Sequence, residues 1–475
     1  MRLSVRLLAA SALALGLAAP AFAQDAATIQ RATTIRDAAM SRNIAMDYVT
    51  QLTTRFGARP AGSNSERDAA AWAADYMRAQ GFQNVRIEEF PLVGWERGEE
   101  SASIVGDHPQ RLVVAALGHS PGTNGVIEAD VVRFDSLEAL NAAPAGSLAG
   151  KIAYIDAGQM VRMQDGAGYG PLTRIRGAGP GAAAAKGAVA FIMRSVGSDD
   201  HRMPHTGTTR YVDGRVPVPG FALSAPDASQ VSRLIAMGQT VRLRLSSTAH
   251  TYETVSRNVV GEITGRTRPE EVIVLGSHMD SWDLGTGAID DGAGGAITLG
   301  AAKAIAESGR RPARTVRVVL YGSEEVSQPT NTGNGGGAYV RGIGAAVEKH
   351  IIAGESDFGA DRVFALGLPP GAQDSEFARI AGRVLYPIGV LPSAQPELHG
   401  GADVGPLAEA GVPVFGLSQD GTRYFDLHHT ADDTLDKIDP KQMSQNVAAW
   451  AALVWLIADS DVDFRAMRPA AAAAH

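Results

Sequence analysis

Residues 278–291 read His-Met-Asp-Ser-Trp-Asp-Leu-Gly-Thr-Gly-Ala-Ile-Asp-Asp, and this stretch decides which fold the chain is expected to adopt. The apolar run Val272–Leu275 precedes it, and a glycine-rich segment after it opens a predicted helix at Ala293–Glu307. A buried strand, a polar loop and a helix in this order form the unit of α/β proteins with a parallel sheet. In open sheets of this kind, ligands bind just beyond the carboxyl ends of the strands. We therefore expect the histidine and the aspartates of this stretch to lie at a binding site.

Further apolar runs are followed by polar side chains of the same kinds. In chain order, Val316–Tyr321 precedes Glu324 and Glu325, His350–Ala353 precedes Glu355 and Asp357, and Val412–Leu417 precedes His428 and His429. A lone pair of glutamates or histidines is more often solvated or packed than part of a site. Chance does not readily place such groups beyond successive strands, however, and His, Asp and Glu are ligands of divalent metals such as zinc. The sequence predicts a metal site at this edge of the sheet.

The spacing within the motifs indicates separate roles. His278 and Asp280 lie two residues apart, so in extended backbone both point to one face, where the carboxylate can hold the far imidazole nitrogen. Adjacent glutamates diverge at a strand end. One of Glu324 and Glu325 can therefore bind metal while the other remains free as a base.

The remaining segments predict an α/β fold with a second module. We expect a mainly parallel central sheet flanked by helices, with a further strand at Val259–Ile263 and helices at Gly337–Val347, Ser375–Val384, Asp403–Ala410 and Pro440–Ala458. Between residues 100 and 250, short strand-like pieces lie among glycine-rich turns, which indicates a separate β-rich module. Its His201 and His205 have arginine neighbours that repel a cation, so we interpret them as loop histidines and not as ligands.

Composition and the N-terminus narrow the class of protein. The chain of 475 residues is long for one domain, and its net charge of −8 without a basic run argues against nucleic-acid binding. The absence of cysteine excludes disulfides, thiolate metal sites and a lipid-bearing cysteine. Arg2 and Arg6, the apolar run Leu7–Ala19 and Ala21-Phe22-Ala23 are typical of a signal peptide cleaved before Gln24. The run is shorter than the roughly 20 residues of a membrane span, so we expect a secreted or periplasmic protein that leaves the membrane.

With these motifs in order, the chain resembles the co-catalytic two-zinc aminopeptidases of the bacterial leucyl aminopeptidase type, and within them the plasma glutamate carboxypeptidase (carboxypeptidase Q) branch. The resemblance covers nearly the whole mature chain and includes Arg97-Gly98-Glu99-Glu100-Ser101, residues 209–214 and Glu355-Ser356-Asp357. It implies a zinc exopeptidase fold. It also implies that the β-rich module is an inserted protease-associated domain, with Gly150-Lys151-Ile152 and residues 186–190 as its strands.

The resemblance implies a role for each residue of the predicted site. Asp290 matches the aspartate that bridges two zinc ions, commonly followed by a cis peptide bond, here to Asp291. His278 and Asp357 match the other ligands of one zinc, and Glu325 and His429 match those of the second. Glu324 matches the general base and Asp280 the aspartate that holds His278. Of the histidine pair, His429 and not His428 fits the family pattern. The loop Val326–Gly336 departs from common relatives, which leaves the substrate preference open.

The expected organisation follows from these assignments. We expect a signal peptide at 1–23, a peptidase domain at 24–112 and 247–465 interrupted by the protease-associated domain at 113–246, and a disordered tail at 466–475. The implied enzyme is a two-zinc aminopeptidase or dipeptidase that cleaves short peptides with a free N-terminus, and a homodimer is compatible with it. Asp283 and Asp420 are candidate partners of the substrate ammonium. Two alternatives remain: a metal-free peptidase-like binding scaffold, and an acyl-amino-acid hydrolase or glutaminyl-cyclase-like enzyme on the same fold.

Overall fold

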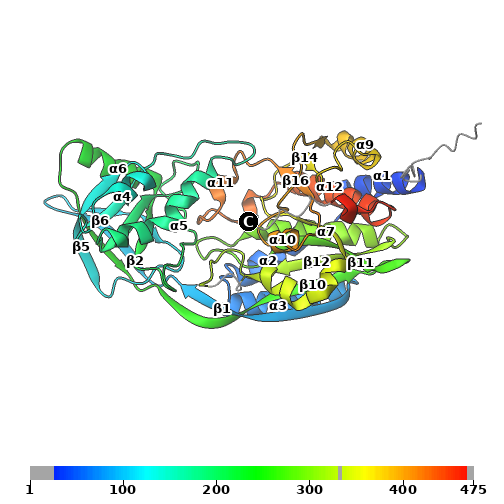
Figure 1. The fold of residues 1–475 in the computed structure, drawn as a ribbon, viewed down its shortest axis with the longest axis horizontal. Coiled ribbons are helices and arrows are strands. Elements are labelled where there is room, and N and C mark those ends of the chain that lie inside the picture. Colours follow the sequence, from blue (N-terminus) through cyan, green and yellow to red (C-terminus); the bar gives the residue numbers. More distant parts are fainter. Residues whose placement is uncertain (1–25, 330–333, 468–475) are drawn as a thin grey trace, which may run out of the picture.

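The computed structural model describes residues 26–329 and 334–467, which form two bodies at opposite ends of an elongated molecule (Figure 1). One body is an α/β domain and the other is rich in strands. The predicted signal peptide lies outside the described residues, as do residues 468–475. Ala466 and Met467, expected in the tail, belong to the short 3₁₀ helix η5 (Phe464–Met467). Within the described ranges, no helix is long and apolar enough to cross a membrane.

The α/β domain is built on a five-stranded sheet of order β1-β10-β12-β11-β13. The strands are β1 (Gln83–Glu96), β10 (His250–Ile263), β12 (Arg314–Tyr321), β11 (Arg268–His278) and β13 (His350–Glu355). β11 runs parallel to both of its neighbours, whereas β1, β10 and β12 pair antiparallel. The α/β class is confirmed, but the sheet is mixed. The apolar run Val259–Ile263, expected among parallel strands, is the end of the long strand β10, which returns from the strand-rich body beside β1 (Figure 1).

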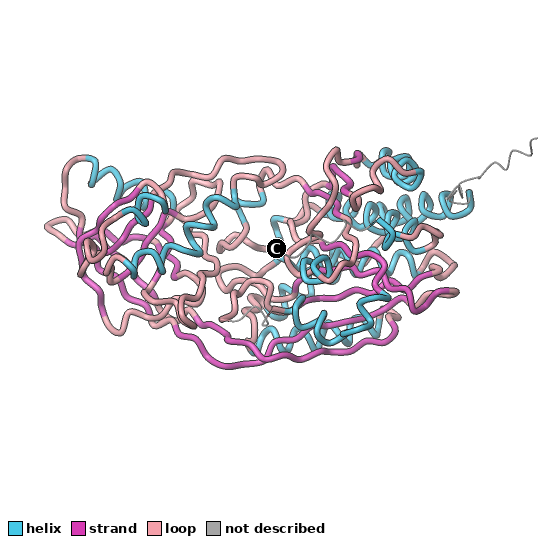
Figure 2. Tube along the Cα trace, viewed as in Figure 1, coloured by secondary structure: helices cyan, strands magenta, loops and turns pink. Residues whose placement is uncertain are grey.

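Helices cover this sheet and bury its apolar side chains. They are α1 (Ala26–Ser41), α2 (Ala45–Phe56), α3 (Asn64–Ala79), α7 (Ala293–Ala306), α8 (Gly335–Ile343), α9 (Glu376–Leu385), α10 (Gly405–Glu409), α11 (Tyr424–Leu427) and α12 (Pro440–Ala458). The structure confirms the predicted helix over Pro440–Ala458, which contacts α1 and α7 and is buried on every side from Gln445 onward. A helix that is apolar all round is a core helix. Figure 2 shows these helices gathered at one end of the molecule.

The strand-rich body, which we call the inserted domain, spans residues 100–247. Its eight strands follow the order β3-β2-β9-β5-β6-β7-β8-β4. They are β2 (Glu100–Val105), β3 (Gln110–Leu112), β4 (Val114–Ala116), β5 (Val126–Phe134), β6 (Ile152–Ile155), β7 (Ala190–Arg194), β8 (Gly220–Leu223) and β9 (Arg242–Ser247), with helices α4 (Leu137–Ala142), α5 (Tyr169–Ala185) and α6 (Ala225–Ala236). β2 and β3 precede the predicted boundary at residue 113, and they belong to the same sheet as β9, with which β2 pairs.

A small third sheet precedes His428 and His429 in the chain. It has the order β15-β14-β16, with β14 (Val363–Gly367), β15 (Leu391–Pro392) and β16 (Gly416–Gln419). The predicted strand Val412–Leu417 is replaced by a single bridge from Val414 to Ala353, followed by β16. The run therefore changes partners midway, leaving β13 for β14.

Candidate metal centre

The predicted ligands converge at the carboxyl edge of the α/β sheet. His278 ends β11, and Glu324 and Glu325 follow β12. Asp357 lies two residues beyond β13, and His429 follows α11. Asp290 lies in the kinked, non-helical turn over Ala288–Gly292 that leads into α7. Register pairs His278 with Tyr321 and Gly276 with Glu355, so three strand ends lie at one level.

Asp290 lies between two groups of side chains. One of its oxygens, Oδ1, lies 3.2 Å from Nε2 of His278, and that nitrogen lies 3.3 Å from Oδ1 of Asp357. The other oxygen, Oδ2, lies 3.2 Å from Nε2 of His429, which is 2.8 Å from Oε2 of Glu325. The donor atoms of His278, Asp290 and Asp357 lie close enough together to hold one ion, and those of Asp290, His428 and His429 lie close enough to hold another. One carboxylate, that of Asp290, belongs to both groups, and Glu325 adjoins the second through His429.

His428 also lies at the centre, which the sequence did not predict. Its Nε2 is 3.4 Å from Oδ2 of Asp290, and its ring stacks on that of His429 with centroids 3.5 Å apart. Burial together with the neighbouring His429 holds the pKa of His428 well below its ordinary value, and burial lowers the pKa of His429 to about 4. Both imidazoles are therefore held in the neutral form that can bind a metal.

Three contacts favour His429 over His428 as the ligand. Its Nδ1 donates to the carbonyl oxygen of Thr206 at 3.3 Å, which leaves Nε2 as the free, unprotonated nitrogen. That Nε2 also lies closer to Asp290 than does Nε2 of His428, and it contacts Glu325. Thr206 belongs to the inserted domain, and its amide in turn donates to the carbonyl oxygen of His429 at 3.0 Å.

The centre holds more buried carboxylates than the protein neutralises. Burial raises the pKa of Glu324, Glu325 and Asp357, and the surrounding carboxylates raise it further. At Asp290 the effect of burial is outweighed by His428, His278 and His429, which lower its pKa. Oδ2 of Asp290 and Oε1 of Glu325 are buried and accept no hydrogen bond. Buried anionic oxygens without a hydrogen-bond donor suit a cation, so the donor set fits a metal.

Asp280 fixes the two glutamates as well as the histidine. Its carboxylate accepts the amide N–H of Glu324 at 3.1 Å and that of Glu325 at 3.2 Å. Nδ1 of His278 lies 3.0 Å from the backbone carbonyl of Asp280 and 3.5 Å from its carboxylate. The carbonyl is thus the nearer acceptor of that ring. The Asp280 carboxylate joins the loop after β12 to the loop after β11.

Three further residues support the centre, and the sequence did not identify them. Asp291 accepts the amide of His278 at 3.1 Å and that of Gly294 at 2.9 Å, beyond a cis peptide bond from Asp290 that the family resemblance predicted. Asp433 accepts the amides of Ile289 and Asp290, at 2.6 and 3.3 Å.

The third is Arg59, which is wholly buried in the segment between α2 and α3. Its guanidinium donates to four backbone carbonyls, at 2.7 Å to those of Gly57, Met279 and Thr286 and at 2.9 Å to that of Gly287. Burial lowers its pKa. Arg59 therefore ties together both ends of the loop between His278 and Asp290. The sequence showed only a turn at residues 59–63, and backbone carbonyl partners carry no sequence signal.

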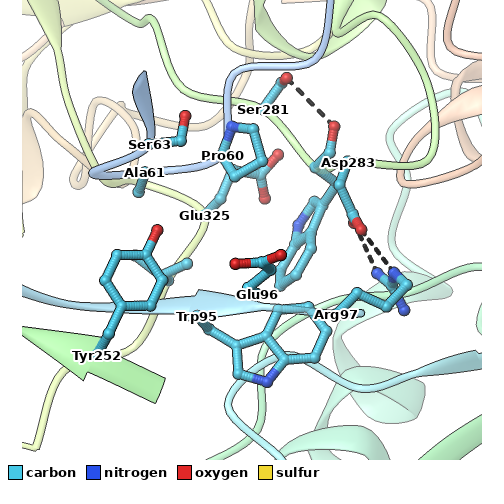
Figure 3. Close-up of a pocket in the computed structure, with 12 residues that line it drawn as sticks. Pro60, Ala61, Ser63, Trp95, Glu96, Arg97, Tyr252, Ser281, Asp283 and Glu325 are labelled. Carbon is cyan, nitrogen blue, oxygen red and sulfur yellow. Dashed lines mark hydrogen bonds and ion pairs between the residues drawn. The ribbon is translucent and has the colours of Figure 1, made fainter. Parts of the chain in front are cut away.

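A cavity of about 140 Å³ opens beside Glu325 (Figure 3). Trp95, Trp282 and Tyr252 line it together with Pro60, Ala61, Ser63, Glu96, Arg97, Ser281, Asp283 and Val326. Val326 begins the loop Val326–Gly336 that departs from common relatives, and residues 330–333 of this loop lie outside the described ranges. Asp283 was a candidate partner of the substrate ammonium, but its carboxylate is already paired, because Arg97 binds both of its oxygens at 2.6 and 2.7 Å. Asp420 is tied to Thr422 and Gln164 near the surface.

The histidines of the inserted domain differ from each other. The side chain of His201 is largely exposed, as expected of a loop histidine. His205 also lies in a loop but is only 3% exposed, and its Nε2 is 2.6 Å from Asp199. It precedes Thr206, the partner of His429. The backbone of this segment therefore contacts the metal centre through Thr206.

Comparisons with known proteins agree with this geometry. The sequence pattern described as "Peptidase family M28" matches residues 258–454. Carboxypeptidase Q of Mus musculus is 35% identical over 411 residues, which cover 85% of this chain and 83% of that protein, and the Homo sapiens protein is 34% identical over 427 residues, covering 89% and 86%. The crystal structure described as a Peptidase M28 precursor, from Shewanella amazonensis, is 42% identical, with a TM-score of 0.88 over 93% of this chain and 98% of that chain. A zinc aminopeptidase from Bacillus subtilis shares the fold, with a TM-score of 0.61 at 19% identity over 88% and 97% of the two chains.

Proposed function

Since the chain belongs to peptidase family M28 and is a metallo-exopeptidase, we propose that it hydrolyses short peptides with a free N-terminus by means of two zinc ions. The observation that carries this proposal is the position of Asp290 between two groups of ligands, with a buried oxygen toward each. His278 and Asp357 would hold one ion, and Glu325 and His429 the other. Two ions at such a site polarise the scissile carbonyl and lower the pKa of a water.

Glu324 is the proposed general base. Asp280 fixes its backbone, and burial raises the pKa of its carboxyl well above the ordinary value. The carboxylate takes a proton from the attacking water and passes it to the amine of the departing residue. A carboxylate whose proton affinity is raised suits both steps.

Acidic side chains beyond the proposed ligands favour binding of the amino end of a peptide at the centre. Glu355 and Asp403 are buried beside the His278 half of the centre, and each has one oxygen without a hydrogen-bond donor. Their charges act on Asp357, Glu324 and one another. An ammonium group is the natural counter-ion for such a cluster. The complete ligand set argues against the metal-free scaffold.

The first experiment measures metal content together with peptide hydrolysis. Protein purified without chelator should contain about two zinc ions per chain, and it should cleave an unblocked dipeptide in a chelator-sensitive manner. Folded protein that contains no metal and stays inactive after zinc is added would contradict the proposal. N-terminally blocked dipeptides serve as the control, because equal turnover of blocked and free substrates would favour an acyl-amino-acid hydrolase.

The Glu324→Gln variant tests the base. It should retain both metal ions and lose at least about a hundredfold in kcat, the usual contribution of a general base. Glu409→Gln, at an exposed position of α10, is the matched control and should keep full activity. Full turnover in Glu324→Gln would remove Glu324 from this role.

We also propose that the chain is exported, with cleavage before Gln24. The proposal rests on the N-terminal sequence, from Arg2 to Ala23. N-terminal sequencing of protein recovered from the periplasm or medium should begin at Gln24. Recovery of Met1 on exported protein would contradict it.

A further inference from the structure

A second cavity opens on the His278 side of the metal centre. Its volume is about 270 Å³, and it lies where β14 and β16 meet the loop after β13 (Figure 1). Asp357, a proposed metal ligand, forms part of its wall, so the cavity adjoins the centre. The other lining residues that matter for its chemistry are Asp165, Glu355, Phe358, Phe364, Glu397 and Gly416.

The charge of this cavity has one sign. Four of its lining side chains are carboxylates, and no lysine, arginine or histidine of the described ranges lines it. Asp357 lies beside His278 and is assigned to the metal, which leaves Asp165, Glu355 and Glu397. None of these three forms an ion pair with a described residue. Exposed carboxylates are readily satisfied by water and salt, however, so the charge alone does not make a binding site.

Glu355 supplies a buried acceptor that lacks a partner. The residue ends β13 and is 8% exposed. Its Oε2 accepts the amides of Asp403 and Val404 at 3.0 and 2.9 Å, whereas its Oε1 is buried and has no hydrogen-bond donor among the described residues. A buried carboxylate oxygen without a donor costs free energy, so it favours a ligand that brings one. In the proposed function this ligand is the α-ammonium group of the substrate.

Glu397 brings a second carboxylate to the same cavity, and half of it is held in place. Its Oε1 accepts the amide N–H groups of Leu398, His399 and Gly400, each at 3.0 Å. Its Oε2 accepts no hydrogen bond from a described residue and lies against Gly416 of β16, where a Cβ atom would be 2.7 Å away. The missing side chain at Gly416 leaves the space that this oxygen occupies. Because three amides hold one oxygen, the other can bind a cation without a change in the loop.

Two phenylalanines give the cavity walls for an aliphatic chain. Phe358 follows Asp357 and stacks on Tyr424 with ring centroids 4.6 Å apart, and Phe364 belongs to β14. The inserted domain lies against Phe358, since a Cβ atom at Gly166 would be 2.7 Å from its ring. An apolar cavity of about 150 Å³ can hold benzene, so this larger one has room for a long side chain. Aromatic walls with carboxylates suit a side chain that is aliphatic along its stem and cationic at its tip.

Building on the proposed function, we propose that this cavity binds the side chain of the substrate's N-terminal residue and makes the enzyme selective for lysine and arginine at that position. Glu355 binds the α-ammonium group, and the side chain of the same residue passes Phe358 and Phe364. Its ammonium or guanidinium group then binds the free oxygen of Glu397, a charge-assisted contact. Asp165, the exposed carboxylate of the lining, adds negative charge that attracts the same substrates.

The test compares lysyl-leucine with norleucyl-leucine, because norleucine has the carbon chain of lysine without the ammonium group. The wild-type enzyme should have a kcat/KM for lysyl-leucine at least about 10-fold above that for norleucyl-leucine, and arginyl-leucine should behave as lysyl-leucine does. Glu397→Gln keeps an oxygen for the three amides and loses the charge. It should lower kcat/KM for lysyl-leucine about 10- to 100-fold and leave that for norleucyl-leucine unchanged.

Two further variants separate charge from structure. Ser418→Lys, at an exposed position of the lining, adds a cation to the cavity and should lower kcat/KM for lysyl-leucine more than for norleucyl-leucine. Glu409→Gln removes an exposed carboxylate of α10 outside the cavity and should change neither value.

Three results would count against the proposal. An equal loss for both dipeptides in Glu397→Gln would overturn it and make Glu397 a support of its own loop. Equal cleavage of both by the wild type, or a preference for norleucyl-leucine, would overturn it while leaving the exopeptidase intact. No cleavage of either by zinc-loaded protein would contradict the proposed function as well.

Discussion

Replacing Arg59 by methionine should destabilise the protein severely. The substitution leaves four backbone carbonyls without their guanidinium donor, at Gly57, Met279, Thr286 and Gly287. A buried acceptor left unpaired costs about 1–3 kcal/mol. The Gly287 carbonyl still accepts from the amide of Gly292, so three carbonyls are left unpaired. Because the loop can relax and water can enter, we take the lower bound for each of the three and expect a loss of about 3 kcal/mol. That is a large part of the 5–15 kcal/mol typical of a folded domain.

The assay is urea unfolding followed by circular dichroism, with zinc and with chelator. The free energy of unfolding should fall in both conditions, and the chelated variant should be close to unfolded in buffer. Arg59→Lys should lose less, since an ammonium still donates to some of the carbonyls. Arg55→Met, four residues earlier in the chain and exposed, should cost less than about 1 kcal/mol. A free energy of unfolding for Arg59→Met that lies within about 1 kcal/mol of the wild-type value would refute the claim that Arg59 holds the loop.

Three further predictions concern the metal and the pH. Asp280→Asn turns an acceptor of two amides into a group that can accept only through one oxygen, so zinc affinity measured by chelator competition should fall about 10- to 100-fold. His429→Ala should lose close to one zinc per chain by elemental analysis, whereas His428→Ala should keep both; the reverse result would exchange their roles. Burial raises the pKa of Glu66 to about 7, so its contribution to stability is present at acidic pH and is lost as pH rises toward and through 7. Glu66→Gln should therefore raise the urea midpoint at pH 8 relative to wild type and leave it nearly unchanged at pH 5; an equal effect at both pH values would contradict this sign.

The positions of the proposed ligands could be predicted because their information is local. Each follows an apolar run, and strand ends of a parallel sheet meet at one edge, so His278, Glu325 and Asp357 come together from topology alone. The helix over Pro440–Ala458 was equally clear, because a long apolar stretch behind a proline and an aspartate cap specifies both its start and its burial.

What could not be predicted depends on contacts between distant segments. Val259–Ile263 looks like a parallel strand because both faces of β10 are buried there, and burial does not encode direction. Arg59 donates to backbone carbonyls, and Thr206 accepts through its own backbone carbonyl. Any residue can supply such a carbonyl, so the sequence does not mark these contacts. The choice between His428 and His429 depends on a hydrogen bond from the inserted domain, more than 200 residues earlier in the chain.

The burial of α12 has a consequence for the order of synthesis. This helix packs against α1 and α7 in the α/β domain, yet it follows the other described α-helices of that domain in the sequence and so leaves the ribosome after them. Until residue 458 has emerged, α1 and α7 lack the helix that each contacts most extensively, so the core of the domain stays incomplete. A nascent chain whose core stays open until α12 has emerged is the form that a translocation channel for unfolded polypeptides can thread. The same arrangement makes a stop codon anywhere before α12 equivalent to the loss of the whole domain.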